Sequence, residues 1–145
     1  GVLTAAADVD REVLAKKVAA IREAVARIRQ VLPDSPEAFR GDRTVREIVV
    51  LNLFIGVQES IAIATHWLAD EGWDVPQSYG EAFTILADRK VIDSELAERL
   101  RAAAGLRNLI AHQYAAVDAD RIFDLAANDL EDLVTLCAQI ARHVK

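Results

Sequence analysis

The stretch RNLIAHQY, residues Arg107–Tyr114, sets the expected architecture of the chain. A helix turns about 100° per residue, so the leucine and isoleucine of this stretch fall on one side, opposite Arg107, Asn108 and His112. Asn108 and His112 are i,i+4 neighbours, and their side chains should lie one above the other. Tyr114 follows shortly after, where the helix is expected to end. The stretch therefore predicts a helix anchored in a core on one side and carrying a polar cluster on the other.

Apolar residues at helical spacing continue in both directions from this stretch, and no segment alternates with period two. The expected helices cover residues 10–32, 36–39, 44–69, 79–87 and 94–114, with one final helix from 118 onward. This pattern predicts an all-α fold, an up-and-down helical bundle with short inserted helices. We expect a single helical domain over residues 1–145.

Four polar sites are expected to begin helices. The sequences Thr44-Val45-Arg46-Glu47 and Ser78-Tyr79-Gly80-Glu81 both match the capping box, in which the first and last side chains bond to each other's backbone N–H. Asp93 and Asp118 are suited to the N-cap position of the two later helices.

The predicted helix over residues 44–69 is apolar nearly all round. Ile48, Leu51 and Ile55 lie on one stripe, while Leu53 and Val57 lie on another. A helix with this pattern is buried from several directions. We therefore expect it to be the central helix of the bundle, a subunit interface, or both.

Composition indicates a globular chain in a reducing compartment. Its 145 residues are 52% apolar and 28% charged, which is enough for a hydrophobic core. The single cysteine, Cys137, excludes an internal disulfide and is expected to be a buried, inert thiol. No signal peptide is visible, and the longest apolar stretch, Ile48–Val57, is too short to span a bilayer. We therefore expect a cytoplasmic protein without membrane contact.

The net charge of −6 argues against a broad, non-specific surface for nucleic acid. The charge is nevertheless uneven, because residues 11–30 are rich in Lys and Arg whereas residues 117–132 are rich in Asp and Glu. This leaves two interpretations open. One is a local basic cleft together with an acidic face for a basic partner, and the other is two solvated helix faces.

The polar cluster suits cleavage of an RNA phosphodiester bond. The chain has no His-Glu-x-x-His motif, no cysteine pair and no Gly-rich phosphate loop, so we expect neither a metal site nor a cofactor. His112 could exchange a proton with a ribose 2′-hydroxyl or the leaving 5′-oxygen. Arg107 could bind the scissile phosphate, and Asn108 could hold the imidazole or a phosphate oxygen.

One histidine cannot readily serve as base and acid at once, so two copies of the cluster across a dimer interface would form a more complete site. On chemistry alone, a purely structural Arg–His–Tyr hydrogen-bond cluster at a helix end is an equal alternative.

The motif R-N-x-x-x-H-x-Y within Arg107–Tyr114, with Ser78–Phe83 upstream and Asp118 downstream, resembles the HEPN superfamily, specifically its HepT-like toxin branch. The family motif R-x(4–6)-H is matched at its shortest spacing, with Asn as the polar residue after Arg. The resemblance implies a bundle that forms a homodimer, with two motifs facing a shared cleft. It also implies a metal-independent ribonuclease acting on transfer RNA or messenger RNA, and not on DNA.

The same resemblance implies the toxin of a toxin–antitoxin pair. Its antitoxin would be a small MntA-type nucleotidyltransferase that transfers AMP to the motif tyrosine, here Tyr114. Arg107 and His112 carry over as catalytic residues and Asn108 as a supporting residue. The alternatives are a non-catalytic helical dimer that binds a nucleotide or a nucleotidyltransferase through the same cleft, and a subunit that presents such a partner.

Overall fold

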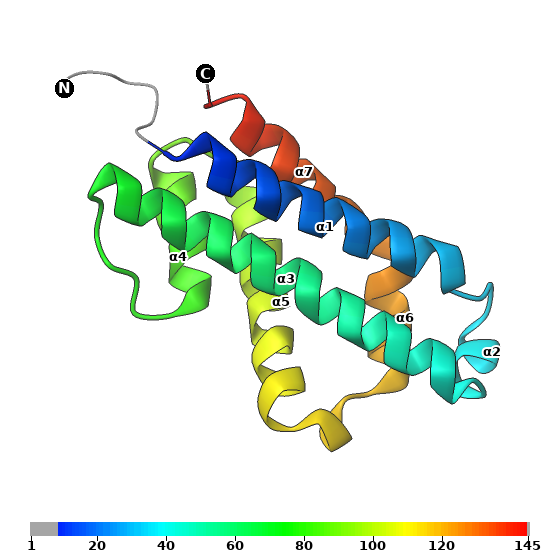
Figure 1. Ribbon diagram of the computed structural model, residues 1–145. Coiled ribbons are helices and arrows are strands. Elements are labelled where there is room, and N and C mark those ends of the chain that lie inside the picture. The colour runs from blue at the N-terminus through cyan, green and yellow to red at the C-terminus, as the bar shows by residue number, and fades with distance from the viewer. Residues whose placement is uncertain (1–8, 145) are drawn as a thin grey trace.

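The computed structural model describes residues 9–144, whose regular secondary structure is entirely helical (Figure 1). The predicted all-α bundle with short inserted helices is confirmed. The elements are α1 (Arg11–Val31), α2 (Pro36–Arg40), α3 (Arg43–Glu71), α4 (Tyr79–Asp88), α5 (Ser94–His112), the 3-10 turn η1 (Tyr114–Ala116), α6 (Ala119–Asn128) and α7 (Leu130–Ala141).

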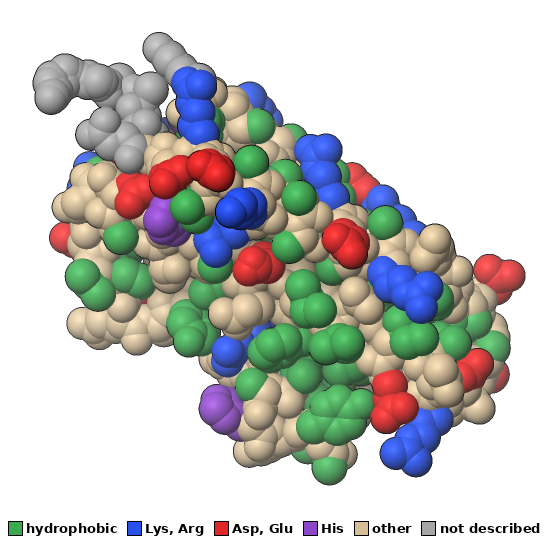
Figure 2. Space-filling view, in the orientation of Figure 1, with side chains coloured by type: hydrophobic (Ala, Val, Ile, Leu, Met, Phe, Trp, Pro, Cys, Tyr) green, Lys and Arg blue, Asp and Glu red, His purple; other side chains and the backbone are tan. Residues whose placement is uncertain are grey.

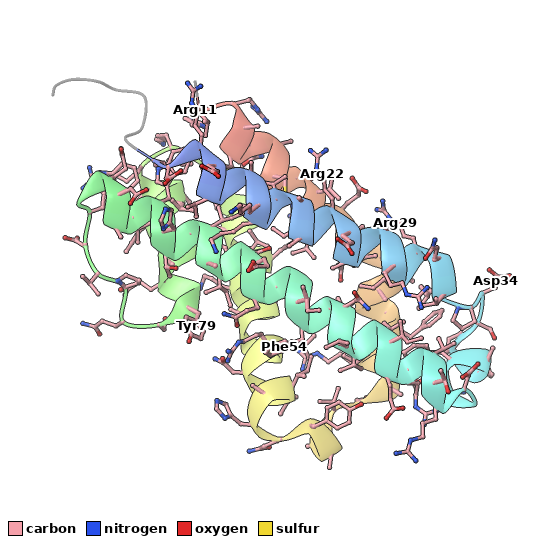
Figure 3. All side chains as sticks on the ribbon, in the orientation of Figure 1. Arg11, Arg22, Arg29, Asp34, Phe54 and Tyr79 are labelled. Atoms are coloured by element: carbon pink, nitrogen blue, oxygen red, sulfur yellow. The ribbon has the colours of Figure 1, made fainter. Side chains whose placement is uncertain are left out.

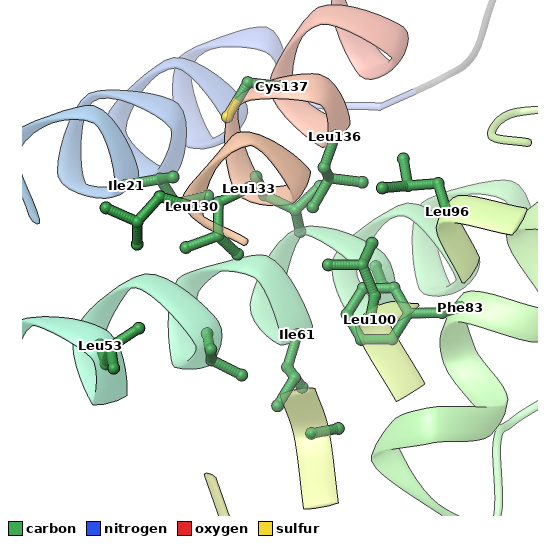
Figure 4. Close-up of a cluster of buried hydrophobic side chains, with 14 of the residues drawn as sticks. Ile21, Leu53, Ile61, Phe83, Leu96, Leu100, Leu130, Leu133, Leu136 and Cys137 are labelled. Carbon is green, nitrogen blue, oxygen red and sulfur yellow. The ribbon is translucent and has the colours of Figure 1, made fainter. Parts of the chain in front are cut away.

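Helix α3 is the centre of the bundle. It lies against α1 over most of its length and also contacts α2, α4, α5, α6 and α7 (Figure 1). Its inner side supplies Leu53 and Ile61 to a core that also includes Ile21, Leu100 and Leu133 (Figure 4). The prediction of a central helix is therefore confirmed, because neighbouring helices cover α3 from several directions.

The length of α3 bears on the expectation, drawn from the sequence, that no apolar segment is long enough to span a bilayer. By length and mean hydropathy alone the whole of α3 could cross a membrane, whereas the apolar stretch Ile48–Val57 by itself is too short to do so. Half of its most apolar window is buried inside the protein, which is the usual environment of a core helix.

The start of α3 differs from the prediction. Thr44 was expected to be the N-cap residue, but it lies inside the first turn, and Asp42 occupies the cap. The carboxylate of Asp42 accepts a hydrogen bond from the Val45 backbone N–H at 3.1 Å. An aspartate this close to a helix N-terminus gains both the cap bond and the favourable helix dipole, so the helix begins earlier than the threonine.

The second capping box is confirmed in part. Ser78 accepts from the backbone N–H of Glu81 at 3.1 Å. The Glu81 carboxylate reaches back to the N–H of Gln77, at 2.8 Å, rather than to that of Ser78. This cap fixes the first turn of α4, where Tyr79 begins the helix.

Asp93 occupies the N-cap position of α5, but its side chain makes no capping bond. Its carboxylate instead accepts from Gln139 Nε2 at 2.7 Å, while its backbone N–H donates to Gln139 Oε1 at 2.9 Å. The paired bonds fasten the start of α5 to α7.

The single final helix predicted from Asp118 is wrong. Asp118 does cap a helix, accepting from the Asp120 N–H at 2.9 Å, but that helix ends at Asn128. Asp129 then leaves the helical conformation, with φ −116° and ψ 5°, and α7 begins at Leu130. Asn and Asp compete with the helical backbone for hydrogen bonds, which explains a break at this pair. It lets α6 pack on α2 and α3 while α7 packs on α1 and α5.

Gly72 ends α3 in the left-handed conformation, with φ 70°. A Cβ atom here would meet nothing within 4 Å, so substitution by alanine strains only the backbone. We expect Gly72→Ala to lower the free energy of unfolding by about 1–2 kcal/mol. Gly105, inside α5, also has open space around its Cβ position. The matched Gly105→Ala variant should be more stable by about 0.5–1 kcal/mol, because alanine favours a helix. Urea denaturation of both variants would measure the two changes in the free energy of unfolding, which are expected to have opposite signs. A Gly72→Ala protein as stable as the wild type would contradict the prediction.

Candidate functional site

Arg107 is held in place by side chains from α3, α4 and its own helix, α5. Its Nε donates to Gln58 Oε1 of α3 at 2.6 Å, and its Nη1 donates to Asn108 Oδ1 at 3.1 Å. The guanidinium carbon lies 5.1 Å from the ring centroid of Phe54 on α3 and 5.2 Å from that of Tyr79 at the start of α4. Figure 3 labels Phe54 near the place where α3 crosses α5, and Tyr79 at the start of α4. A half-buried arginine between two aromatic rings has a fixed orientation.

His112 and Asn108 are more exposed than Arg107. His112 is the last residue of α5, which closes with the Gln113 N–H donating to the Leu109 carbonyl at 2.8 Å. Within residues 9–144 the structure shows no hydrogen bond from the His112 ring or from Asn108 Nδ2. Hydrogen bonds therefore connect only part of the predicted polar cluster. Arg107 and Asn108 are bonded, whereas the imidazole is free to meet a ligand.

The opposite side of α5 is anchored as predicted. Leu106 and Ile110 are buried in the core, and Leu109 is half-buried against it. This places the polar side chains of the motif on the outer side of a helix whose position is set by packing.

Tyr114, whose direction the sequence leaves open, lies in η1 and is 55% exposed. It lines a cavity of about 220 Å³ together with Arg43, Arg46 and Glu47 from the first turn of α3. Tyr114 therefore shares this cavity with two arginines and one glutamate from the start of α3. Among the described residues, no hydrogen bond joins it to Arg107.

A larger cavity, of about 610 Å³, lies beside Arg107. Tyr79 and Asn108, which both contact Arg107, belong to its wall, and the rest comes from the end of α3 and the loop that follows. The side chains from that region are mainly apolar and include Leu68, Trp73 and Val75.

The basic helix predicted near the N-terminus does not join this site. Arg11, Arg22 and Arg29 follow α1, which lies on the other side of α3 from the C-terminal end of α5 (Figure 3). Arg29 is paired with Glu131 at 2.6 Å. This favours the interpretation of a solvated helix face over that of a basic cleft beside the motif.

Cys137 and His66 lie away from the motif, in surroundings that fit structural roles. Cys137 is buried, and burial raises the pKa of its thiol and disfavours the reactive thiolate. His66 lies with Nε2 3.1 Å from Asp70 Oδ2, on the same helix face. Across residues 9–144, no group of three His, Cys, Asp or Glu side chains is arranged to hold a metal ion.

Sequence reasoning did not identify Gln58, Phe54, Tyr79, Arg43 or Arg46 as neighbours of the motif. All of them come from other helices, and only the crossing of α3 with α4, α5 and η1 brings them close. The apolar pattern of α3 offered one indirect signal, because Gln58 interrupts it with a polar side chain.

Comparison with known proteins agrees with this architecture. Residues 21–140 match the family described as ribonuclease HepT-like. The mRNA nuclease HepT of Shewanella oneidensis is 32% identical over 121 residues, which covers 83% of this chain and 90% of that protein. A putative RNase of Archaeoglobus fulgidus is 28% identical over 123 residues, covering 85% and 89%.

A solved structure has a closely similar fold. It is the tri-AMPylated HEPN toxin of Shewanella oneidensis in complex with its MNT antitoxin, which superposes with a TM-score of 0.85 at 30% identity and covers 92% of this chain and 99% of that one. The fold, the motif on α5 and these matches lead to one conclusion: the chain belongs to the HepT-like ribonuclease family.

Proposed function

We propose that this protein is the toxin of a toxin–antitoxin pair, a metal-independent endoribonuclease that uses Arg107 and His112, supported by Asn108. One contrast carries the proposal. Arg107 is fixed by Gln58, Phe54 and Tyr79. The imidazole of His112, five residues later on the same helix, makes no hydrogen bond within the described residues. A relative with this fold is an mRNA nuclease, which supports RNA as the substrate.

The bonds of Arg107 leave part of its guanidinium available. Nε is occupied by Gln58 and one Nη1 hydrogen by Asn108, so the Nη2 amine and the other Nη1 hydrogen can bind phosphate oxygens. The charge that develops on those oxygens in the transition state would be stabilised there. No reorientation of the arginine is needed, because its contacts already hold it.

The proposed reaction needs no external nucleophile. The ribose 2′-oxygen attacks phosphorus, its proton passes to one His112, and the bond from phosphorus to the 5′-oxygen breaks as a second imidazole donates a proton to it. The products are a 2′,3′-cyclic phosphate and a 5′-hydroxyl. Two imidazoles in one site require a homodimer.

The outer side of α3 supports this dimer. Leu51, Ile55, Gln58 and Ala62 recur at intervals of four, three and four residues, and Leu51 is 57% exposed. This is the spacing of a helix–helix seam. Hydrophobic side chains gather over the middle of α3 and next to α5 in Figure 2. Gln58 belongs to this stripe and bonds Arg107, so the proposed interface is continuous with the catalytic set.

Leu51→Asp should convert the dimer to a monomer and lower RNA cleavage strongly, because it places an unpaired carboxylate in an apolar seam. Sedimentation velocity at micromolar concentration would give the oligomeric state, with cleavage assayed on the same sample. Ala19→Asp is the matched control, since Ala19 is exposed on α1 and lies outside both the stripe and the cavity beside Arg107. A Leu51→Asp protein that remains dimeric would remove this interface.

The central test is incubation of purified protein with transfer RNA and messenger RNA in excess EDTA, beside His112→Ala, after intact mass has shown the protein to be unmodified. Cleavage that resists EDTA and is lost in His112→Ala is the expected result. Cleavage that persists in the variant, or that EDTA abolishes, would overturn the assignment.

Neutralisation is proposed to occur by AMP transfer to Tyr114 from an MNT-type nucleotidyltransferase antitoxin. The Shewanella oneidensis toxin, which is tri-AMPylated in its complex with an MNT antitoxin, supports this proposal. An added nucleotide brings bulk and negative charge close to a phosphate-binding site, which would repel RNA. Incubation with such an antitoxin and ATP should raise the mass of the wild type, but not of Tyr114→Phe, by whole AMP units.

The cavity of about 610 Å³ beside Asn108 favours a second candidate, a non-catalytic dimer that binds a nucleotide or a nucleotidyltransferase through the same cleft. Nucleotide binding without cleavage of any RNA by the unmodified protein would support this candidate over the nuclease.

A further inference from the structure

We propose that Arg43 and Arg46 form a phosphate-binding site for the nucleotide attached to Tyr114. The inference rests on the proposed function and adds to it the residues that hold the neutralised state. Its starting observation is the shared cavity of about 220 Å³, whose wall includes the tyrosine and both arginines.

The three side chains come from segments far apart in the sequence. Tyr114 is the first residue of η1, whereas Arg43 and Arg46 lie in the first turn of α3. The chain between α5 and α6 passes near the beginning of α3, and α6 packs against α3 (Figure 1). The apolar side of the cavity, which includes Phe39, Val50 and Ile122, fixes this juxtaposition, because Phe39 and Ile122 are fully buried.

The existing partners of the two arginines leave capacity for a ligand. Arg43 is 81% exposed and its pair with Glu47 is loose, with Nε 3.7 Å from Oε2. Arg46 directs Nη1 to the carbonyl oxygen of Arg40, a neutral acceptor, and within residues 9–144 no carboxylate forms an ion pair with Arg46. Neighbouring Arg40 is already committed to Asp120 at 2.6 Å, so it is not part of the proposed site.

The chemistry of the adduct matches these groups. In AMP transfer the Tyr114 oxygen attacks the α-phosphorus of a nucleoside triphosphate, the bond to pyrophosphate breaks, and the phenolic proton leaves with a base or water. The product is a phosphodiester with one negative charge for each nucleotide added. Arginine is well suited to such a group, because its planar fork binds phosphate oxygens in pairs. Tyr114 lies two residues after His112, so a nucleotide held on Tyr114 by the two arginines would stay close to the end of α5.

The test compares thermal stability before and after modification within each variant. Full-length wild type, Arg43→Gln/Arg46→Gln and the control Arg11→Gln/Arg27→Gln are each treated with an MNT-type antitoxin and ATP, separated from it, and checked by intact mass. The control removes two exposed arginines of α1, away from the cavity. Any stability lost through the substitutions themselves cancels, because only the change in Tm on modification is compared.

We expect modification to raise the Tm of the wild type and the control by about 2–6 °C, and that of Arg43→Gln/Arg46→Gln by less than half as much. Equal shifts in all three proteins, or no rise in the wild type, would overturn the inference while leaving the proposed function intact. A wild type that gains no mass would overturn the modification of Tyr114 and this inference together.

The wild type alone provides a second measurement, in case the double variant folds or is modified poorly. Pairing between exposed charges weakens as salt screens it, so the rise in Tm on modification should shrink between about 0.01 M and 1 M NaCl. A rise that is independent of salt would contradict a charged site and overturn the proposal.

Discussion

Arg107→Ala is expected to lower the rate of RNA cleavage by about 10²–10³-fold, the effect of removing a donor aimed at transition-state charge. The guanidinium is oriented by Gln58 and Asn108 and lies between two aromatic rings, so the wild type requires no rearrangement before it binds phosphate. Cleavage of a fluorescent RNA in excess EDTA would measure the loss. Circular dichroism and thermal melting would show that the variant remains folded.

Two further substitutions define what the arginine contributes. Arg107→Lys keeps the charge but lacks the fork that reaches Gln58, Asn108 and a phosphate together, so it should recover little of the lost rate. Arg101→Ala removes another arginine of α5, one that bonds Thr84 at 2.6 Å, and should leave cleavage nearly unchanged. A folded Arg107→Ala protein with the rate of the wild type would exclude Arg107 from the reaction.

Phe83→Ala is expected to lower the free energy of unfolding by about 3–5 kcal/mol. The ring is fully buried on α4, in the core that α4 shares with α5 and α3, and Figure 4 shows it among Leu96, Leu100 and Ile61. Removing it leaves a cavity that surrounding helices cannot fill without moving α5. Guanidinium chloride denaturation, followed by helical circular dichroism, would measure the change.

Two controls accompany this measurement. Phe83→Leu retains most of the buried volume and should lose much less stability. Val75→Ala, at a position that is 87% exposed, should change the free energy of unfolding by at most about 0.5 kcal/mol. A loss below about 1 kcal/mol for Phe83→Ala would show that the contact between α4 and α5 is not a main source of stability.

Most of the helical architecture is predictable from the sequence because it depends on local patterns. The spacing of apolar residues gives the long helices, and the apolar surface of α3 predicts its central place. Errors arose where two local signals competed. Asp42 and Thr44 are both possible caps, and only the observed bond to Val45 shows which one begins the helix. At Asp129 an apolar stripe continues through a residue whose backbone leaves the helix.

The candidate site was predictable only in part. The relative placement of Arg107, Asn108 and His112 follows from helix geometry, since all three lie on α5. Gln58, Phe54 and Tyr79 could not be assigned as neighbours of Arg107, because their proximity depends on the angles at which α3 and α4 pack against α5. The same reason applies to Arg43 and Arg46 beside Tyr114, which lie about seventy residues from it in the chain.

Gln58 lies on the outer stripe of α3 and also bonds Arg107 at 2.6 Å. These two roles link the activity of the protein to its concentration. If a second chain covers that stripe, the same encounter that supplies the second imidazole also shields the bond that orients the arginine. Activity then follows the concentration of dimers rather than that of monomers. At low expression, activity therefore falls more steeply than the amount of protein. For the proposed toxin, a cell would then tolerate a small release from the antitoxin better than a larger one.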